Sequence, residues 1–262
     1  MMSLFVEGAG VIAPGLSDWV AAAPILRGDA PYVPADLPSN PPQLLPANER
    51  RRASASVRLA FVAAEDAVRG SRRAPADLAS VFATSEADTP ILHRLCSALA
   101  QEPRVLSPTD FHNSVHNAAA GYWSIATGCK QPSASISAYD ATFTAGLLEA
   151  AALVQADAGG ALLVCYDTVP PGPLHAARPL ADACATALVL AREPSRALAR
   201  LDVEQTREPE SRLDDPGLER LRLGNPAGRG LPLLRALALG APGAVTVAGV
   251  GALRYRIAVT PC

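Results

Sequence analysis

Short apolar runs alternate with longer segments of helical spacing along most of the chain, and this order limits the folds available to it. The run at residues 161–166 is continuously apolar, which is typical of a strand covered on both faces of a sheet. Residues 51–68 instead carry apolar side chains three or four positions apart, as one face of a helix does. Because strands and helices alternate, we predict an α/β layered fold with a mixed central sheet.

The expected elements cover nearly the whole chain of 262 residues. A turn is expected at Gly8-Ala9-Gly10, and Ser17 and Asn48 are expected to cap helices. We predict a main domain at residues 1–207 and a short remnant at 208–262 that completes the fold. Strands are predicted at residues 4–6, 78–83, 134–138, 161–166, 184–191, 197–203, 245–250 and 253–259, and helices at 51–68, 90–99, 112–126, 141–156 and 231–239.

Charge and cysteine spacing argue against several classes of protein. The formal net charge is −2 and no basic face is clustered, so a nucleic-acid partner is not expected. No run approaches the roughly 18 apolar residues of a membrane-spanning helix, so no membrane span is expected. The five cysteines have no Cys-x-x-Cys spacing, which is typical of free thiols in the cytoplasm, where we expect the protein to act.

The most informative segment begins with the letters SPTDFHNSVHNAAAG at residue 107 and ends in a helix after Asp140. It resembles the β-ketoacyl synthases of the thiolase superfamily. That family has an Asn-x-x-Ala-Gly helix ending in Ser-Ile, then a Gly-x-x-x-Pro turn, a strand, and the nucleophile at a strand-to-helix elbow. The resemblance extends from residue 3 to about residue 195. The matching positions are Asn117, Ala120, Gly121, Ser124, Ile125, Gly128 and Pro132.

Two departures from the family pattern decide the functional interpretation. Aligning Ile136-Ser137 with the family's strand puts Asp140 where the nucleophilic cysteine is expected. A carboxylate there could form only an unstable anhydride with an acyl group, whereas a thiolate forms a thioester. The family's two histidines in the second half of the fold are also missing, since no histidine follows His175, and that second half is abbreviated.

These departures resemble the chain-length-factor subunits, which pair with an active ketoacyl synthase. The sequence FHNSVHN further resembles the ketoacyl-synthase-like partner subunits of bacterial aryl polyene and xanthomonadin-type pigment gene clusters. The resemblance implies a heterodimer with a synthase, built on the central strand and the Asn-x-x-Ala-Gly helix, an indirect link to an acyl carrier protein, and no cofactor. The residues expected to line the acyl tunnel or the interface are Phe111, His112, Asn113, Ser114, His116, Asn117, Tyr139 and Phe143.

Several alternative interpretations stay open. Asp140 has a structural use as a cap for the helix that follows it. The chain could instead be an enzyme by itself, decarboxylating or hydrolysing an acyl thioester with Asp140 and His112 or His116, or it could be an acyl-binding scaffold. His112 and His116 would share a helix face, but they lack a third ligand, so no metal site is expected. Gly8-Ala9-Gly10 lacks the third glycine of a dinucleotide fingerprint, which argues against nucleotide binding.

Overall fold

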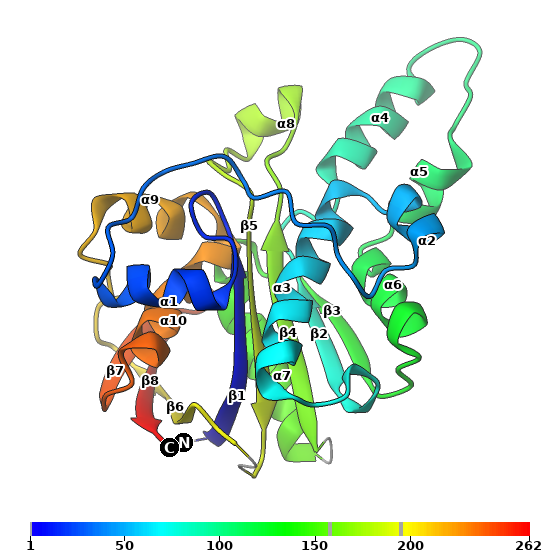
Figure 1. The fold of residues 1–262 in the computed structure, drawn as a ribbon. Coiled ribbons are helices and arrows are strands. Elements are labelled where there is room, and N and C mark those ends of the chain that lie inside the picture. Colours follow the sequence, from blue (N-terminus) through cyan, green and yellow to red (C-terminus); the bar gives the residue numbers. More distant parts are fainter. Residues whose placement is uncertain (1, 157–158, 194–195) are drawn as a thin grey trace.

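A computed structural model describes residues 2–156, 159–193 and 196–262. Its described strands form one eight-stranded sheet in the order β3-β2-β4-β5-β1-β6-β8-β7 (Figure 1). β2 pairs in parallel with β3 and β4, and the other pairings are antiparallel. The predicted mixed sheet is therefore confirmed. The strands are β1 Met2–Ile12, β2 Ala79–Ala83, β3 Ser133–Ile136, β4 Gly160–Asp167, β5 Cys184–Ala191, β6 Ala199–Thr206, β7 Gly243–Ala248 and β8 Arg254–Pro261.

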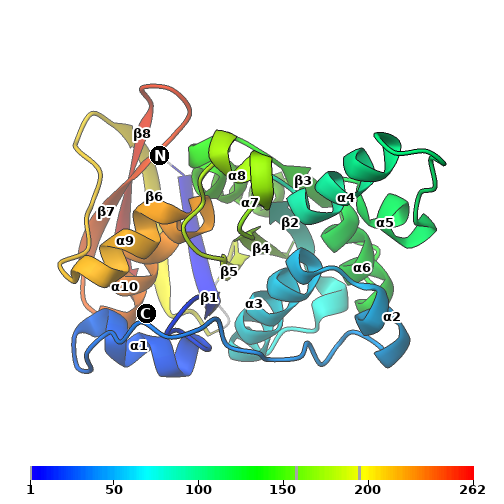
Figure 2. The same cartoon turned by 90° about the horizontal axis from the view of Figure 1, so that it is seen from above.

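Helices cover both faces of this sheet. Figure 2 shows α3 and α7 on opposite sides of β4 and β5. The burial of β4 explains this arrangement, because Leu162 packs into the core cluster with α3 and α6, whereas Leu163 packs into the cluster with α7 and α10. The helices are α1 Trp19–Arg27, α2 Ala47–Arg52, α3 Ala55–Ser71, α4 Thr89–Leu99, α5 Pro108–Asn113, α6 Ala118–Thr127, α7 Thr142–Ala156, α8 Gly172–Ala177, α9 Pro216–Gly224 and α10 Leu231–Leu239, with 3₁₀ turns η1 Pro75–Asp77, η2 Tyr139–Ala141 and η3 Pro226–Gly230.

The turn expected at Gly8-Ala9-Gly10 is wrong, because β1 runs straight through these residues with a bulge between Val6 and Gly8. The two glycines serve close packing instead. A Cβ atom on Gly8 would lie 2.1 Å from the carbonyl oxygen of Ala67, and one on Gly10 would lie 2.2 Å from that of Ala63. The backbone of α3 therefore lies directly against β1, which no larger residue would permit.

Two predicted helix caps are also wrong. Asn48 lies inside α2, and the segment expected as one helix divides into α2 and α3. α3 begins after Ser54, whose hydroxyl accepts a hydrogen bond from the amide of Val57. α1 is capped by Asp18 rather than Ser17, because the Asp18 carboxylate accepts from the amide of Ala21.

The helix expected at residues 112–126 is interrupted. α5 ends at Asn113 and α6 begins at Ala118. The buried Asn113 side chain donates a hydrogen bond to the carbonyl of Arg52, which ties the end of α5 to α2. His112 and His116 therefore do not share one helix face, and the spacing argument for a metal pair loses its basis.

The contact between α3 and β1 predicts a large cost for a single methyl group. Gly8→Ala should destabilise the chain by about 2 kcal/mol or more, since the carbonyl of Ala67 cannot move without shifting α3. Gly243→Ala is the matched control, because a Cβ atom there meets nothing within 4 Å, and its effect should stay within about 0.5 kcal/mol. Urea unfolding measures both, and equal stability of the two variants would contradict the packing argument.

Candidate functional site

Three parallel strands end together at one edge of the sheet, and the polar groups beyond them form the candidate site. β2 ends at Ala83, β3 at Ile136 and β4 at Asp167. The carboxyl ends of parallel strands are a common location for binding and catalytic groups in α/β folds. α8, which follows β4 in the chain, stands at this end of the sheet (Figure 1).

The chain passes from β3 to α7 through a tight elbow. Tyr139 has a φ of 55°, a left-handed backbone that is uncommon for an aromatic residue. The hydroxyl of Thr142 donates to the carbonyl of Tyr139 at 2.6 Å and accepts from the amide of Ala138 at 3.1 Å. These bonds hold the turn from beneath, so the side chains of Tyr139 and Asp140 lie at the surface.

Arg178, just after α8, connects the elbow to the loop that follows β2. Its guanidinium forms ion pairs with Asp140 at 2.8 Å and with Glu86 at 2.9 Å. It also lies over the Tyr139 ring, 3.6 Å from the centroid, in a cation–π arrangement. The Arg178 side chain is only 12% exposed, so solvent screens these contacts less than it screens ordinary surface pairs.

The structure gives Asp140 a partner other than a helix terminus. Its ion pair is with Arg178, and no backbone amide of the described residues donates to its carboxylate. The described residues therefore show no capping hydrogen bond to Asp140, and Thr142 makes the local hydrogen bonds at the start of α7.

Asp167 fixes the loop that carries Glu86. This carboxylate is fully buried, and its Oδ1 accepts from the hydroxyl of Thr84 at 2.7 Å and from the amides of Ser85 at 2.9 Å and Glu86 at 3.2 Å. Burial raises the pKa of Asp167 to about 7, although these hydrogen bonds favour the charged form. The side-chain amide of Asn225 donates to the backbone carbonyl of Asp167, which ties η3 to the same point.

The two candidate histidines lie apart from the Arg178 cluster. His112 packs edge-on against the Tyr122 ring and lines a pocket of about 280 Å³ with Arg52. His116 lies between α5 and α6 and lines a cavity of about 10 Å³ beside Asp88. Among the described residues, neither histidine shares a hydrogen bond or an ion pair with Asp140.

The remaining predicted residues fall into the same two groups. Phe111 and Asn117 are exposed near α5 and α6, and the Ser114 hydroxyl donates to the Phe111 carbonyl. Phe143 belongs to the elbow group, but it is fully buried, and its ring packs against Gly230 of η3.

The sequence prediction missed Arg178, Glu86 and Asp167 as members of the site. Asp167 carries a signal, since it is the acidic residue that ends a continuously apolar strand. Arg178 carries none, because it reaches Glu86 only through the fold.

The described ranges contain neither a metal-binding cluster nor a membrane-spanning helix. No group of three or more His, Cys, Asp or Glu side chains there could hold a metal ion. None of the helices in those ranges is long and apolar enough to cross a membrane.

Comparison with known proteins identifies the fold. The family model for the β-ketoacyl synthase N-terminal domain matches residues 27–221. No curated protein was found to match the chain. A solved structure of a ketosynthase (ApeO) with its chain length factor (ApeC) from Xenorhabdus doucetiae aligns at 23% identity and a TM-score of 0.76, covering 98% of this chain and 100% of that one.

Two further structures have the same fold. The ishigamide ketosynthase/chain length factor aligns at 14% identity and a TM-score of 0.73, over 100% of this chain and 99% of that one. AntDE:AntF, a type II polyketide acyl-carrier protein in complex with its ketosynthase, aligns at 14% identity and a TM-score of 0.77, over 100% and 99%. The predicted thiolase-like fold is therefore confirmed.

The buried Asp167 carboxyl predicts a specific dependence of stability on pH. Its folded pKa of about 7 lies above the value of about 4 in an unfolded chain, so the folded state keeps a proton that the unfolded state releases. Stability should therefore fall as the pH rises through this window, by about 2–3 kcal/mol between pH 5 and pH 8 from this group.

Asp167→Asn cannot titrate but keeps an acceptor oxygen for the loop, so it should remove that part of the slope. Urea unfolding at pH 5, 6.5 and 8 measures the slope. Burial also raises the pKa of Asp66 to about 6. Asp66 is present in both the wild type and the variant, so a smaller decrease of stability with rising pH should remain in Asp167→Asn. Identical dependence of stability on pH in the wild type and Asp167→Asn would rule out Asp167 as the source of the slope.

Proposed function

The chain belongs to the β-ketoacyl synthase N-terminal domain family, and on that premise we propose that it is a non-catalytic partner of an active ketoacyl synthase, a chain length factor. The single observation that carries the proposal is the ion pair formed by Asp140. By the sequence resemblance, this residue stands where the family has its nucleophilic cysteine, and its carboxylate forms an ion pair with Arg178 at 2.8 Å. A carboxylate held in an ion pair is a much weaker nucleophile toward a thioester than a cysteine thiolate.

The cysteines of the chain supply no substitute nucleophile at the elbow. Cys165 and Cys184 are buried in strands, and burial raises the pKa of both thiols, that of Cys184 to about 12. Such thiols stay protonated and inert at neutral pH. Cys129 is buried below α6, whereas Cys96 and Cys262 lie on α4 and at the C-terminus.

The interface with the synthase is proposed on the β3 edge of the sheet. Among the described strands, β3 pairs only with β2, so its outer edge is open to another chain. α6 packs beside it and carries Ile125, which is 77% exposed, and Gly121, where a Cβ atom would meet nothing within 4 Å. We call β3 with Gly121 and Ile125 the partner face.

The exposed glycine of α6 supports this choice. A glycine inside a helix costs about 1 kcal/mol relative to alanine. No described atom of this chain lies close enough to Gly121 to require it. A partner backbone that approaches α6 closely gives the glycine a use.

The acyl tunnel would pass close to the residues predicted for it. Phe111 is exposed on α5, where a partner could cover it, and Phe143 fills the space between α7 and η3. Bulky side chains that close an apolar tunnel discriminate by roughly 1–3 kcal/mol per misfitting methylene. The product class would be a polyketide-like acyl chain, as in the aryl polyene systems that the sequence resembles.

The second candidate function is a stand-alone thioester decarboxylase or hydrolase that uses Asp140 with a histidine. It needs the carboxylate and a histidine to act on one group, and the described contacts of Asp140 lead to Arg178 instead. A third candidate, an acyl-binding scaffold, requires no partner. Both are outcomes of the experiments below.

A charge on the partner face should prevent assembly. Ile125→Asp should abolish the complex formed on co-expression with the synthase, because a buried carboxylate would lack a partner. Val20→Asp on α1 is the matched control, since Val20 is 80% exposed and α1 lies away from β3 (Figure 1), so this variant should still assemble. Native mass spectrometry with a tag on this chain measures the complex.

Either of two results would contradict the partner role. One is a wild-type chain that binds no synthase under these conditions. The other is an isolated chain that turns over a malonyl- or acyl-carrier protein and loses this activity in Asp140→Asn. The latter result would favour the stand-alone enzyme.

The tunnel hypothesis is tested by product length. Phe111→Ala and Phe143→Ala should each shift the product distribution of the reconstituted pair toward longer chains, because each removes a ring that limits space. Phe143→Ala should also lower stability by about 3–5 kcal/mol, since it leaves a cavity in the core. Phe111→Ala should leave stability unchanged because the ring is exposed, so it separates the two effects. Unchanged product lengths in both variants would remove these residues from the tunnel.

A further inference from the structure

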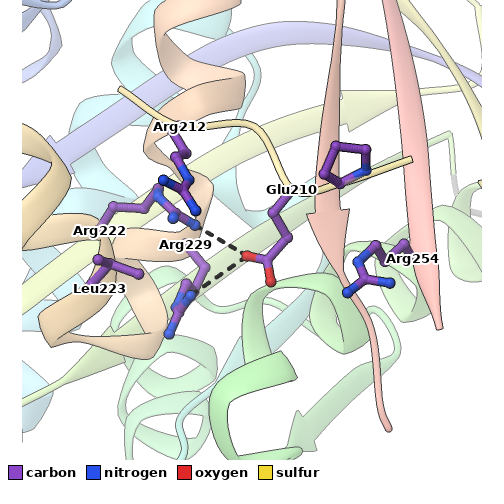
Figure 3. A pocket seen from close by; sticks show the side chains of 7 residues that line it. Glu210, Arg212, Arg222, Leu223, Arg229 and Arg254 are labelled. Atoms are coloured by element: carbon purple, nitrogen blue, oxygen red, sulfur yellow. Dashed lines mark hydrogen bonds and ion pairs between the residues drawn. The ribbon is translucent and has the colours of Figure 1, made fainter. Parts of the chain in front are cut away.

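A second polar site lies away from the elbow, between the segment after β6, helix α9, η3 and the start of β8. It is a pocket of about 300 Å³, and four of its seven lining residues are arginines (Figure 3). The single acidic residue among them is Glu210, which lies between the arginines. The lining residues are Pro209, Glu210, Arg212, Arg222, Leu223, Arg229 and Arg254.

Carboxylates neutralise only part of this positive charge. Arg222 has a side chain only 5% exposed and forms a bidentate pair with Glu219, with both distances 2.7 Å. It also reaches Glu210 at 3.1 Å, and Arg229 shares the same Glu210 oxygen at 3.5 Å. Two carboxylates therefore face four guanidinium groups, in a chain whose formal net charge is −2.

Unused hydrogen-bond donors are further evidence that the positive charge of this pocket is only partly paired. The Nε atoms of Arg229 and Arg254 are buried and have no hydrogen-bond partner among the described residues. The Arg254 side chain forms no hydrogen bond or ion pair with any residue of the described ranges, and the same holds for Arg212. Leaving a buried donor of a charged group unpaired costs free energy, which an anionic ligand would recover.

We propose that this pocket binds a phosphate-type oxyanion, as inorganic phosphate or as a phosphomonoester. Guanidinium groups present planar pairs of donors that match phosphate oxygens, and several can bind one dianion together. Leu223 is 53% exposed on the pocket wall, where it offers an apolar contact to the organic group of a phosphomonoester.

The site is independent of the proposed partner role. β3 lies at one edge of the sheet, whereas Arg254 begins β8 beside the opposite edge strand, β7. A synthase bound on the partner face would therefore leave the arginine pocket open.

Calorimetric titration of the full chain, as purified alone or with its synthase, tests the proposal. The probes are inorganic phosphate and phenyl phosphate at constant ionic strength in chloride. We expect saturable binding of one anion per chain, with phenyl phosphate binding more tightly. Leu223→Ala should remove the advantage of phenyl phosphate and leave phosphate binding intact.

Arg254→Gln should weaken phosphate binding at least tenfold without lowering stability, because the side chain has no partner to lose. Arg212→Gln is the second variant with the same expectation. Arg200→Gln is the matched control. Arg200 forms an ion pair with Asp202, and it lies on β6 six residues before Thr206, the residue that pairs with Arg254 in the sheet. It should bind phosphate like the wild type.

Two outcomes would overturn the proposal. One is the absence of saturable phosphate binding to the wild-type chain. The other is equal binding by the wild type, Arg254→Gln and Arg212→Gln, which would place any bound phosphate elsewhere. Loss of synthase binding in these variants is not expected, so failure here is distinct from failure of the partner role.

Discussion

The buried carboxylate of Asp167 holds together the end of the sheet on which the candidate site depends. One of its oxygens accepts from Thr84, Ser85 and Glu86, so the loop after β2 folds around a single acceptor at the end of β4. This loop presents Glu86 to Arg178, and Arg178 in turn holds Asp140 at the elbow after β3. The three parallel strands are thus joined at their carboxyl ends by hydrogen bonds to Asp167 and by the two ion pairs of Arg178.

The ion pairs of Arg178 affect which reactions the elbow after β3 can support. In a condensing enzyme the elbow must present a group free to attack an acyl thioester. Here Arg178 lies next to the elbow, forms an ion pair with Asp140 and covers the Tyr139 ring. The same contacts that stabilise the turn keep the Asp140 carboxylate in an ion pair, which fits the proposed non-catalytic role. A subunit relieved of catalysis can keep the elbow for its shape alone.

The sequence predicted the sheet well because buried strands have a local signature. The apolar run in β4 and the helical spacing in α3 each depend on neighbours in the chain. β4 formed close to its expected bounds, and α3 covers most of the helix expected at residues 51–68. Gly8 and Gly10 misled the prediction, because a glycine required by a distant helix looks locally like a glycine in a turn. The break between α5 and α6 was missed for a similar reason, since the bond from Asn113 to Arg52 joins residues far apart in sequence. The elbow was located from resemblance, but its partner Arg178 is set by the fold, which no local pattern encodes.

The two edges of the sheet differ in what they offer to other molecules. At the β3 edge the exposed groups are an open strand and the small or apolar positions Gly121 and Ile125, which suit close contact between protein surfaces. Near the β7 edge a pocket is lined by arginines, whose charge resists burial against an apolar surface but suits a small anion. An apolar face costs free energy while it is exposed, and a cluster of cations costs free energy while it is unpaired. The two proposed complexes would use different surfaces, because β3 and β7 lie at opposite edges of one sheet, so they need not compete with each other.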